Sequence, residues 1–258
     1  MGMKPYVIAM SHQKGGVAKT TTASALGATL VEQGNRVLLV DLDPSANLTA
    51  GLGFNPTQMP KSMADILLGN ETLQMVYRST SLPGLDIIPS NPDMVTAARL
   101  LQVRSQHEEL LRQCLTRNGT ELHDFICIDC PPSLGPLTLS ALTASDLVII
   151  PTQCEYYAIQ ALSGIFKTIN FVRSKYNPGL KYRLLVTMFD LRGNLHSQVL
   201  KKMKEHYAGA LFNTKIGFDS KLRASQVEGL PVTIFAPSTR ATQQYRSLAK
   251  EMLAYVEK

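Results

Sequence analysis

The stretch that decides the fold of this chain is residues 14–21, Lys14-Gly15-Gly16-Val17-Ala18-Lys19-Thr20-Thr21. It follows a short apolar run at 6–10 and opens into an Ala-rich stretch at 23–31. A strand, a Gly-rich turn and a helix start are the geometry of a phosphate-binding loop, where backbone N–H groups and the positive end of the helix face an anion. The sequence therefore predicts that all eight residues of this loop contact a bound nucleotide.

Two lysines and a threonine give this loop its chemistry. Lys19 is placed to reach the β- and γ-phosphates, and the Thr20 hydroxyl to ligate Mg²⁺. Lys14 is a second lysine, one positive charge more than a single phosphate chain needs from one subunit. Ala18 stands where the phosphate-loop pattern has glycine, and its methyl group restricts positive φ. The backbone at Ala18 is therefore either ordinary helical or bridge geometry, or it is strained.

Composition excludes several classes of protein. The chain has 258 residues, 45% of them hydrophobic, which fits one large α/β domain or two small ones. We expect no secretory signal and no membrane span, because no apolar run approaches about 18 residues. The four cysteines show no paired metal spacing, although Cys127 and Cys130 are formally C-x-x-C, so we expect reduced thiols and a cytoplasmic protein.

Charge is distributed unevenly along the chain. Residues 1–166 carry 10 Lys and Arg against 14 Asp and Glu, whereas residues 167–258 carry 16 against 6. A basic final third on a mildly acidic body favours a polyanionic partner, first nucleic acid and second an anionic membrane. Scattered solubilising lysines are the alternative interpretation of the same numbers.

Apolar runs alternate with helical patterns along the whole chain. We expect strands at 5–10, 36–41, 85–88, 124–129, 146–151, 182–188 and 211–216. We expect helices at 19–33, 62–69, 92–117, 136–143, 158–175, 194–207, 219–228 and 238–256. This alternation predicts an α/β fold, a mostly parallel twisted sheet with helices on both faces. We find no repeat and no linker, so we expect residues 1–258 to form a single domain, with the irregular stretch 44–84 over the site.

Acidic residues follow two of the expected strands. Asp41 and Asp43 end the strand at 36–41, and Asp129 ends the strand at 124–129. Ligands of open α/β sheets collect at the carboxyl ends of strands, and carboxylates there are costly without a cation or ordered water nearby. We therefore expect Asp41 and Asp129 in the metal site. The small polar runs 44–47 and 132–135 are suited to switch segments that re-order with the γ-phosphate.

Five motifs in this order resemble the ParA family of partition ATPases, in its short, Soj-type form with a deviant Walker P-loop. They lie at residues 14–21, 37–44, 124–135, 149–158 and 187–190. The resemblance covers nearly the whole chain. Only 13 residues precede the loop, so we expect no N-terminal operator-binding domain of the kind that longer partition ATPases carry.

The resemblance implies a mechanism. ATP closes two subunits into a sandwich homodimer, in which Lys14 of each reaches the phosphates of the other, as an arginine finger does in trans. Lys19 binds phosphate within its own subunit, Thr20 and Asp129 hold Mg²⁺, and Asp43 orients the attacking water. The dimer binds double-stranded DNA without sequence preference, and a ParB-like or adaptor protein stimulates slow hydrolysis. The protein would thus be nucleoid-associated.

The chain departs from the family pattern at Ala18, at Ser45 where glutamine is usual, and across residues 216–225. That last stretch is linked to adenine contact and DNA binding in the family. Met188 and Asp190 are our candidates for adenine contact. Arg192, Lys221 and Arg223 are our candidates for DNA contact, and these basic residues suit phosphate contact rather than base reading.

Three other functions compete with this interpretation. A membrane-associated MinD-like positioning ATPase needs an amphipathic C-terminal anchor, whereas we expect the apolar stripe of the last helix to pack on the body. A redox protein of the nitrogenase iron-protein type needs bridging cysteines such as Cys130 or Cys154. A non-enzymatic scaffold with a degenerate loop is the third. Nothing in the sequence identifies the cargo, which could be a plasmid, a chromosome, a carboxysome or a chemotaxis cluster.

Overall fold

The strands of the described residues join in one sheet. This computed structural model describes residues 4–116, 120–155, 158–190 and 194–256. The strand order is β3-β4-β2-β5-β1-β6-β7-β8, parallel throughout except for the antiparallel pair β3–β4. The strands are β1 (Tyr6–Met10), β2 (Val37–Asp41), β3 (Arg78–Ser79), β4 (Leu85–Ile88), β5 (Phe125–Asp129), β6 (Leu147–Gln153), β7 (Lys181–Phe189) and β8 (Leu211–Gly217).

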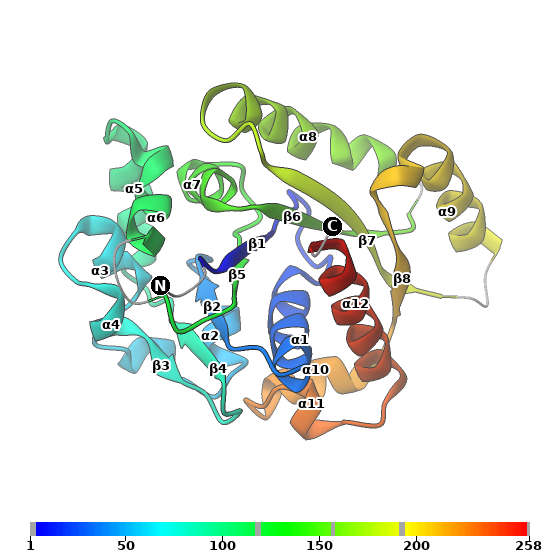
Figure 1. The fold of residues 1–258 in the computed structure, drawn as a ribbon, viewed down its shortest axis with the longest axis horizontal. Helices are drawn as coiled ribbons and strands as arrows, with labels where there is room; N and C mark the ends of the chain where they lie inside the picture. The colour runs from blue at the N-terminus through cyan, green and yellow to red at the C-terminus, as the bar shows by residue number, and fades with distance from the viewer. Residues whose placement is uncertain (1–3, 117–119, 156–157, 191–193, 257–258) are drawn as a thin grey trace.

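Helices cover both faces of this sheet (Figure 1). One face packs against α1, α2, α10, α11 and α12, the other against α3 to α9. The helices are α1 (Lys19–Glu32), α2 (Asn47–Ala50), η1 (Pro56–Gln58), α3 (Met63–Leu68), α4 (Leu73–Val76), α5 (Met94–Val103), α6 (His107–Thr116), α7 (Pro136–Ala144), α8 (Ala158–Lys175), α9 (Asn194–Tyr207), η2 (Ala208–Ala210), α10 (Ser220–Val227), α11 (Val232–Phe235) and α12 (Arg240–Val256).

The predicted α/β fold class is confirmed, and the central strands are continuously apolar because both faces are covered. Every residue of β2 and β5 is buried. Adjacent residues of these strands belong to different core clusters, as Leu38 and Leu39 do. All seven predicted strands are present, and only the two-residue β3 was missed. That residues 1–258 make a single domain stays a prediction.

One predicted helix was wrong. The expected helix at 92–117 is two helices, α5 ending at Val103 and α6 beginning at His107. Gln106 between them has φ 59°, in the left-handed region, and the Arg104 guanidinium donates to the Leu67 carbonyl at 3.1 Å. This tertiary contact and the left-handed residue break a stretch whose side chains by themselves favour one helix.

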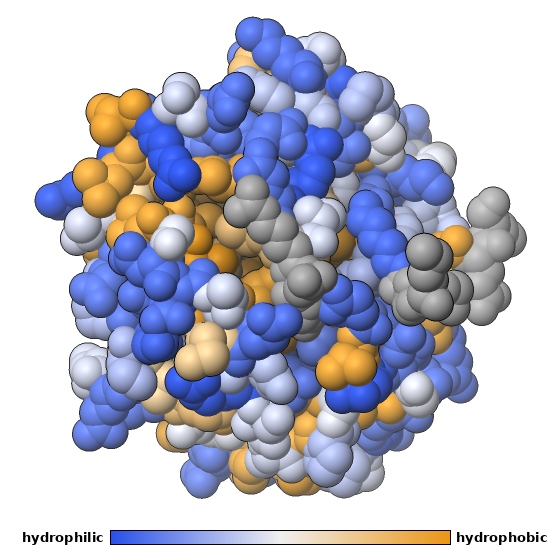
Figure 2. Space-filling view, turned by 60° about the vertical axis from the view of Figure 1, so that its left-hand side comes forward, coloured by the Kyte–Doolittle hydropathy of each residue, from blue (hydrophilic) through white to orange (hydrophobic). Residues whose placement is uncertain are grey.

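The face formed by α3 to α6 carries exposed apolar side chains. Figure 2 shows apolar atoms gathered towards the upper left of a mainly polar surface. The exposed apolar residues of these helices include Met75 of α4 and Val95, Leu100 and Val103 of α5. None of them lines the cavity described below.

The register of the sheet determines which residues lie next to one another at the site. Asp41 of β2 is paired with Asp129 of β5, and Asp129 is paired with Met10 of β1. The carboxyl ends of three neighbouring strands therefore lie side by side, and the phosphate-binding loop leaves β1 directly above them. This is the edge at which open parallel sheets bind ligands.

Candidate nucleotide site

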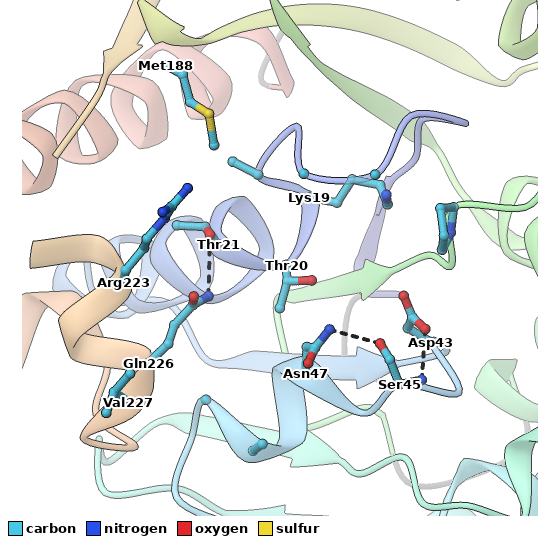
Figure 3. Close-up of a pocket in the computed structure, with 16 residues that line it drawn as sticks. Lys19, Thr20, Thr21, Asp43, Ser45, Asn47, Met188, Arg223, Gln226 and Val227 are labelled. Carbon is cyan, nitrogen blue, oxygen red and sulfur yellow. Dashed lines mark hydrogen bonds between the residues drawn. The ribbon is translucent and has the colours of Figure 1, made fainter. Parts of the chain in front are cut away.

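A cavity of about 620 Å³ opens at this edge, between the loop after β1 and helix α10 (Figure 3). Its volume is that of a small-molecule site. Its lining comes from five parts of the chain: Gly15, Gly16, Ala18, Lys19, Thr20 and Thr21; Asp43, Ser45, Asn47, Ala50 and Gly51; Pro132; Met188; and Arg223, Gln226 and Val227. Six of the eight predicted loop residues are among them.

Lys19 is the cation at the base of this cavity. It is the first residue of α1 and only 7% exposed. The one hydrogen bond described for its ammonium is a long one, 3.4 Å, to the Lys14 carbonyl. A buried ammonium is costly unless it meets an anion. Lys19 is therefore poised to bind a negatively charged ligand at the N-terminus of α1.

Thr20 and Asp129 lie together beside Lys19. The Thr20 hydroxyl donates to Asp129 Oδ2 at 2.6 Å, whereas Asp129 Oδ1 is buried with no hydrogen-bond partner among the described residues. Burial, followed by the neighbouring Asp41, raises the pKa of Asp129 well above its usual range. An unpartnered buried carboxylate oxygen next to a hydroxyl fits a Mg²⁺ ion, which takes one or two carboxylates and completes its shell with phosphate and water. Among the described residues, no group of three or more His, Cys, Asp or Glu side chains could hold a metal ion by itself. An ion here would therefore need the phosphates and water to complete its shell.

Asp41 lies beneath the cavity rather than in its lining. Its Oδ2 accepts from the Thr49 amide at 2.9 Å and the Thr49 hydroxyl at 2.7 Å, and its Oδ1 accepts from the Asp43 amide at 3.1 Å. Burial raises the pKa of Asp41 to about 7, against these hydrogen bonds. Both carboxylate oxygens are thus engaged by the chain, and the geometry supports a structural role for Asp41 more than the metal contact we expected.

Asp43 does line the cavity, on the loop that Asp41 holds. Its Oδ1 accepts from the Ser45 amide at 2.9 Å, and its carbonyl accepts from the Ser90 hydroxyl at 2.8 Å. Asn47 in turn donates to the Ser45 hydroxyl at 2.9 Å (Figure 3). The family departure Ser45 therefore takes part in a short polar chain that fixes the Asp43 loop against the cavity.

Lys14 points away from this cavity. Its ammonium contacts Glu155 Oε2 at 2.5 Å and Gln153 Oε1 at 3.2 Å, both on its own chain. Val17 is buried beneath the loop, and its carbonyl accepts from the Thr187 hydroxyl at 3.0 Å. These two loop residues do not line the cavity in the single chain.

Sequence reasoning gave no role to His12 or Gln153, which brace the loop. The buried His12 ring accepts from the Lys14 amide at 2.8 Å through Nδ1. Burial, and then the charges of Lys19 and Lys14, lower the pKa of His12 to about 4, so the ring stays neutral and can accept. Gln153 donates to the Gly16 carbonyl at 3.0 Å. The available signals were the position of His12 next to the loop and that of Gln153 within the motif at residues 149–158.

Of the backbone geometries considered for Ala18, the structure has the strained one. Its backbone is left-handed, with φ 71° and ψ 34°, which costs a non-glycine residue about 1 kcal/mol or more. We therefore expect Ala18→Gly to raise the melting temperature by about 2–4 °C, since a gain of about 1 kcal/mol has this effect in a chain of this size. Thermal unfolding without nucleotide measures it.

The matched control for this substitution is Ala28→Gly, in the interior of α1, where glycine costs about 1 kcal/mol. The two variants should move in opposite directions. A lower melting temperature for both would show that the left-handed residue carries no strain.

The predicted base and DNA contacts divide between described and undescribed parts of the chain. Met188 lines the cavity and has a left-handed φ of 51°, whereas Asp190 is outside the lining and its amide donates to His196 Nδ1 at 2.9 Å. Lys221 is exposed on α10. Arg223 lines the nucleotide cavity, which DNA contact does not explain. Arg192 lies outside the described residues.

Glycines hold the two walls of the cavity together. Gly53, after α2, and Gly229, after α10, have φ of 87° and 67°. A Cβ on Gly229 would lie 2.6 Å from the Gly53 Cα. Only two residues that both lack a side chain can pack this closely. The backbone after the Asp43 loop and the backbone after α10 are therefore in direct contact.

The cysteines occupy the two faces of the sheet. Cys127 and Cys130 are both buried, in different core clusters, and burial raises the pKa of Cys127 to about 12 and that of Cys130 still further. Burial also raises the pKa of Cys154 to about 11. A cluster that bridges two subunits needs thiols at the surface, whereas Cys127, Cys130 and Cys154 are fully buried, which disfavours the iron-protein alternative.

Comparison with known proteins agrees with this geometry. The profile of a family described as an AAA domain matches residues 5–182. The sporulation initiation inhibitor protein Soj of Bacillus subtilis (strain 168) is 39% identical over 249 residues, which are 96% of this chain and 98% of Soj. The chromosome partitioning protein ParA of Myxococcus xanthus (strain DK1622) is 38% identical over 96% of this chain and 87% of its own.

Solved structures give the same fold. Cobyrinic acid a,c-diamide synthase from Mycobacterium smegmatis, crystallised with a bound ATP analogue and magnesium, superposes with a TM-score of 0.86 at 35% identity. The superposition covers 98% of this chain and 96% of that one. Together with the phosphate-binding loop and the acidic strand ends, these matches show that the chain belongs to the Soj/ParA family of AAA-domain proteins.

Proposed function

We propose that this protein is an ATP-dependent partition or positioning ATPase. The observation that carries the proposal is the buried Lys19 ammonium, which lines the base of the cavity close to the unpartnered oxygen of the buried Asp129. One site thus offers a cation for phosphate and an anion for Mg²⁺. The M. smegmatis relative holds an ATP analogue and magnesium, and the two relatives at 38–39% identity are named for sporulation control and chromosome partitioning.

The residues at the phosphate end of the site have proposed roles in hydrolysis. Lys19 and the backbone amides of 15–21 bind the phosphates of ATP, and Thr20 and Asp129 would hold Mg²⁺, which neutralises charge on the phosphates when bound. Asp43 orients the attacking water from the loop held by Asp41. Lys14 leaves Glu155 and reaches the nucleotide of a second subunit, which makes the ATP-bound form a homodimer.

We propose double-stranded DNA as the surface on which this dimer acts, and a ParB-like or adaptor protein as the stimulator of hydrolysis. The basic final third supports a polyanionic partner. Such a protein would be cytoplasmic and nucleoid-associated. Phosphate release, measured with and without duplex DNA, anionic vesicles and a ParB-like or adaptor protein, tests the activity. No hydrolysis under any of these conditions would leave the scaffold alternative.

The MinD-like alternative is disfavoured by the last helix. Tyr245, Leu248 and Met252 of α12 are fully buried against the sheet and α1, and the Tyr245 hydroxyl lies 3.2 Å from the Thr22 hydroxyl. These side chains are therefore not available to insert into a lipid surface. Across the described residues, no helix combines the length and apolarity that crossing a bilayer requires. Flotation with anionic vesicles and ATP distinguishes the two functions.

Lys221 tests the DNA surface. Its side chain is exposed on α10, with its ammonium 6.0 Å from the centre of the Phe235 ring, and it lies outside the cavity. We expect Lys221→Glu to weaken ATP-dependent DNA binding equally on any sequence and to lower the log–log salt slope by about 0.9. ATP affinity should not change. Filter binding over a salt series measures both quantities.

The matched control for this substitution is Lys4→Glu, an exposed lysine at the amino end of β1. Unchanged DNA retention by the Lys221 variant would show that α10 does not contact DNA. Arg192→Ala, the companion variant, should behave as Lys221→Glu does.

A further inference from the structure

The far end of the cavity has a different chemistry from the phosphate end. Away from Lys19 and Thr20, the lining changes to the Met188 thioether, the Arg223 guanidinium and the Val227 side chain, which is 85% exposed. A second, smaller hollow of about 40 Å³ adjoins it, sharing Ala18, Thr21, Met188 and Arg223 with the large cavity. Figure 3 shows Met188 and Arg223 reaching into the same space above Thr21, from β7 and α10.

Arg223 differs from other arginines of the final third. Arg246 pairs with Glu32, Arg183 donates to the Gly209 carbonyl, and Arg240 to the Phe218 carbonyl. Across the described residues, the guanidinium of Arg223 has no hydrogen bond or ion pair. Its described contact is with the Phe218 ring, whose centre is 5.7 Å from Cζ. With no other described partner, this guanidinium is available to a ligand in the cavity that Arg223 lines.

The segment that carries Phe218 is fixed from both sides. Asp219 caps α10, its Oδ1 accepting from the Lys221 amide at 3.0 Å. Arg240 donates to the Phe218 carbonyl at 3.0 Å and passes so close to Gly217 that a Cβ there would meet it at 2.9 Å. Phe218 is nevertheless 55% exposed. Hydrogen bonds of the neighbouring backbone thus hold a large aromatic side chain at the small hollow that adjoins the cavity.

We infer that Arg223, braced by Phe218, stacks on the base of the bound nucleotide, with Met188 on the opposite side. The inference rests on the proposed function, since it needs a nucleotide with its phosphates on Lys19. A guanidinium plane and a thioether are both suited to the face of a purine. This assignment replaces DNA contact as the role of Arg223, and it gives Phe218 a role that residue type alone did not indicate.

Binding of ATP and of inorganic tripolyphosphate, each with Mg²⁺, separates base contact from phosphate contact. We expect Arg223→Ala to weaken ATP about 10-fold, which is the usual size of one stacking contact, and to leave tripolyphosphate affinity unchanged. Arg223→Lys keeps the charge but removes the plane, so it should resemble Arg223→Ala. Phe218→Ala should weaken ATP in the same direction. Lys4→Ala, an exposed cation away from the cavity, is the control.

Three results would overturn the inference. Wild-type ATP affinity in Arg223→Ala would show that Arg223 makes no contact. Parallel loss of tripolyphosphate, or full rescue by Arg223→Lys, would show that its charge acts on phosphate. Loss of DNA retention by Arg223→Ala, with ATP affinity intact, would show that Arg223 contacts DNA instead of the base. Failure of the proposed function looks different, because Lys19→Ala would then bind both ligands as the wild type does.

Discussion

Lys19→Ala should abolish the function of this protein while leaving its fold intact. Lys19 is 7% exposed, and its described hydrogen bond is a weak one to the Lys14 carbonyl. Removing it therefore breaks little in the free chain, but the bound phosphates lose a charge-assisted contact worth about 2–3 kcal/mol. This corresponds to roughly 30- to 150-fold weaker ATP binding. Isothermal titration measures the affinity, and thermal unfolding confirms the fold.

Removal of this buried ammonium should also leave the free protein as stable as the wild type, or slightly more stable, because an unpaired buried cation is destabilising. Lys4→Ala, at the opposite end of β1, is the matched control and should change neither quantity. An ATP affinity within twofold of the wild type would contradict the assignment of the cavity.

Lys14→Ala should separate binding from hydrolysis. Its side chain is outside the cavity of the single chain, so we expect ATP affinity of the monomer to change little. Its backbone amide still donates to His12, and its carbonyl still accepts from Lys19, so the loop is retained. In a dimer the lost ammonium acts in trans, and we expect hydrolysis to fall by about 10³-fold, as for an arginine finger. Phosphate release and sedimentation with a non-hydrolysable ATP analogue measure the two effects.

Glu155→Gln is the counterpart of this variant. The side chains of Lys14 and Glu155 are 43% and 53% exposed, and an exposed pair contributes at most about 1 kcal/mol. Breaking it from the Glu155 side frees Lys14, so nucleotide-dependent dimerisation should tighten by a few-fold. A Lys14→Ala protein that still dimerises and hydrolyses ATP would contradict the shared site.

The phosphate end of the site could be predicted because its chemistry is local. A strand, two glycines, a lysine and a threonine within one turn fix Lys19 and Thr20 at a helix start wherever the strand lies in the sheet. The place of Asp129 beside Thr20 could be predicted for a similar reason, since it ends an apolar strand. Asp41 has the same sequence signature as Asp129, yet Thr49 occupies it. Sequence position could not distinguish the two carboxylates, because the distinction lies in which neighbour offers hydrogen bonds.

The sequence by itself determined the α/β fold, the phosphate-binding loop and the family, because hydrophobic periodicity and contiguous motifs are properties of short segments. The tertiary structure alone decided what each long side chain faces. It placed Arg223 in the nucleotide cavity, paired Lys14 with Glu155 and broke the helix at Gln106. These outcomes depend on contacts between segments up to 205 residues apart in the chain, and such contacts are set by packing of the whole sheet and its helices.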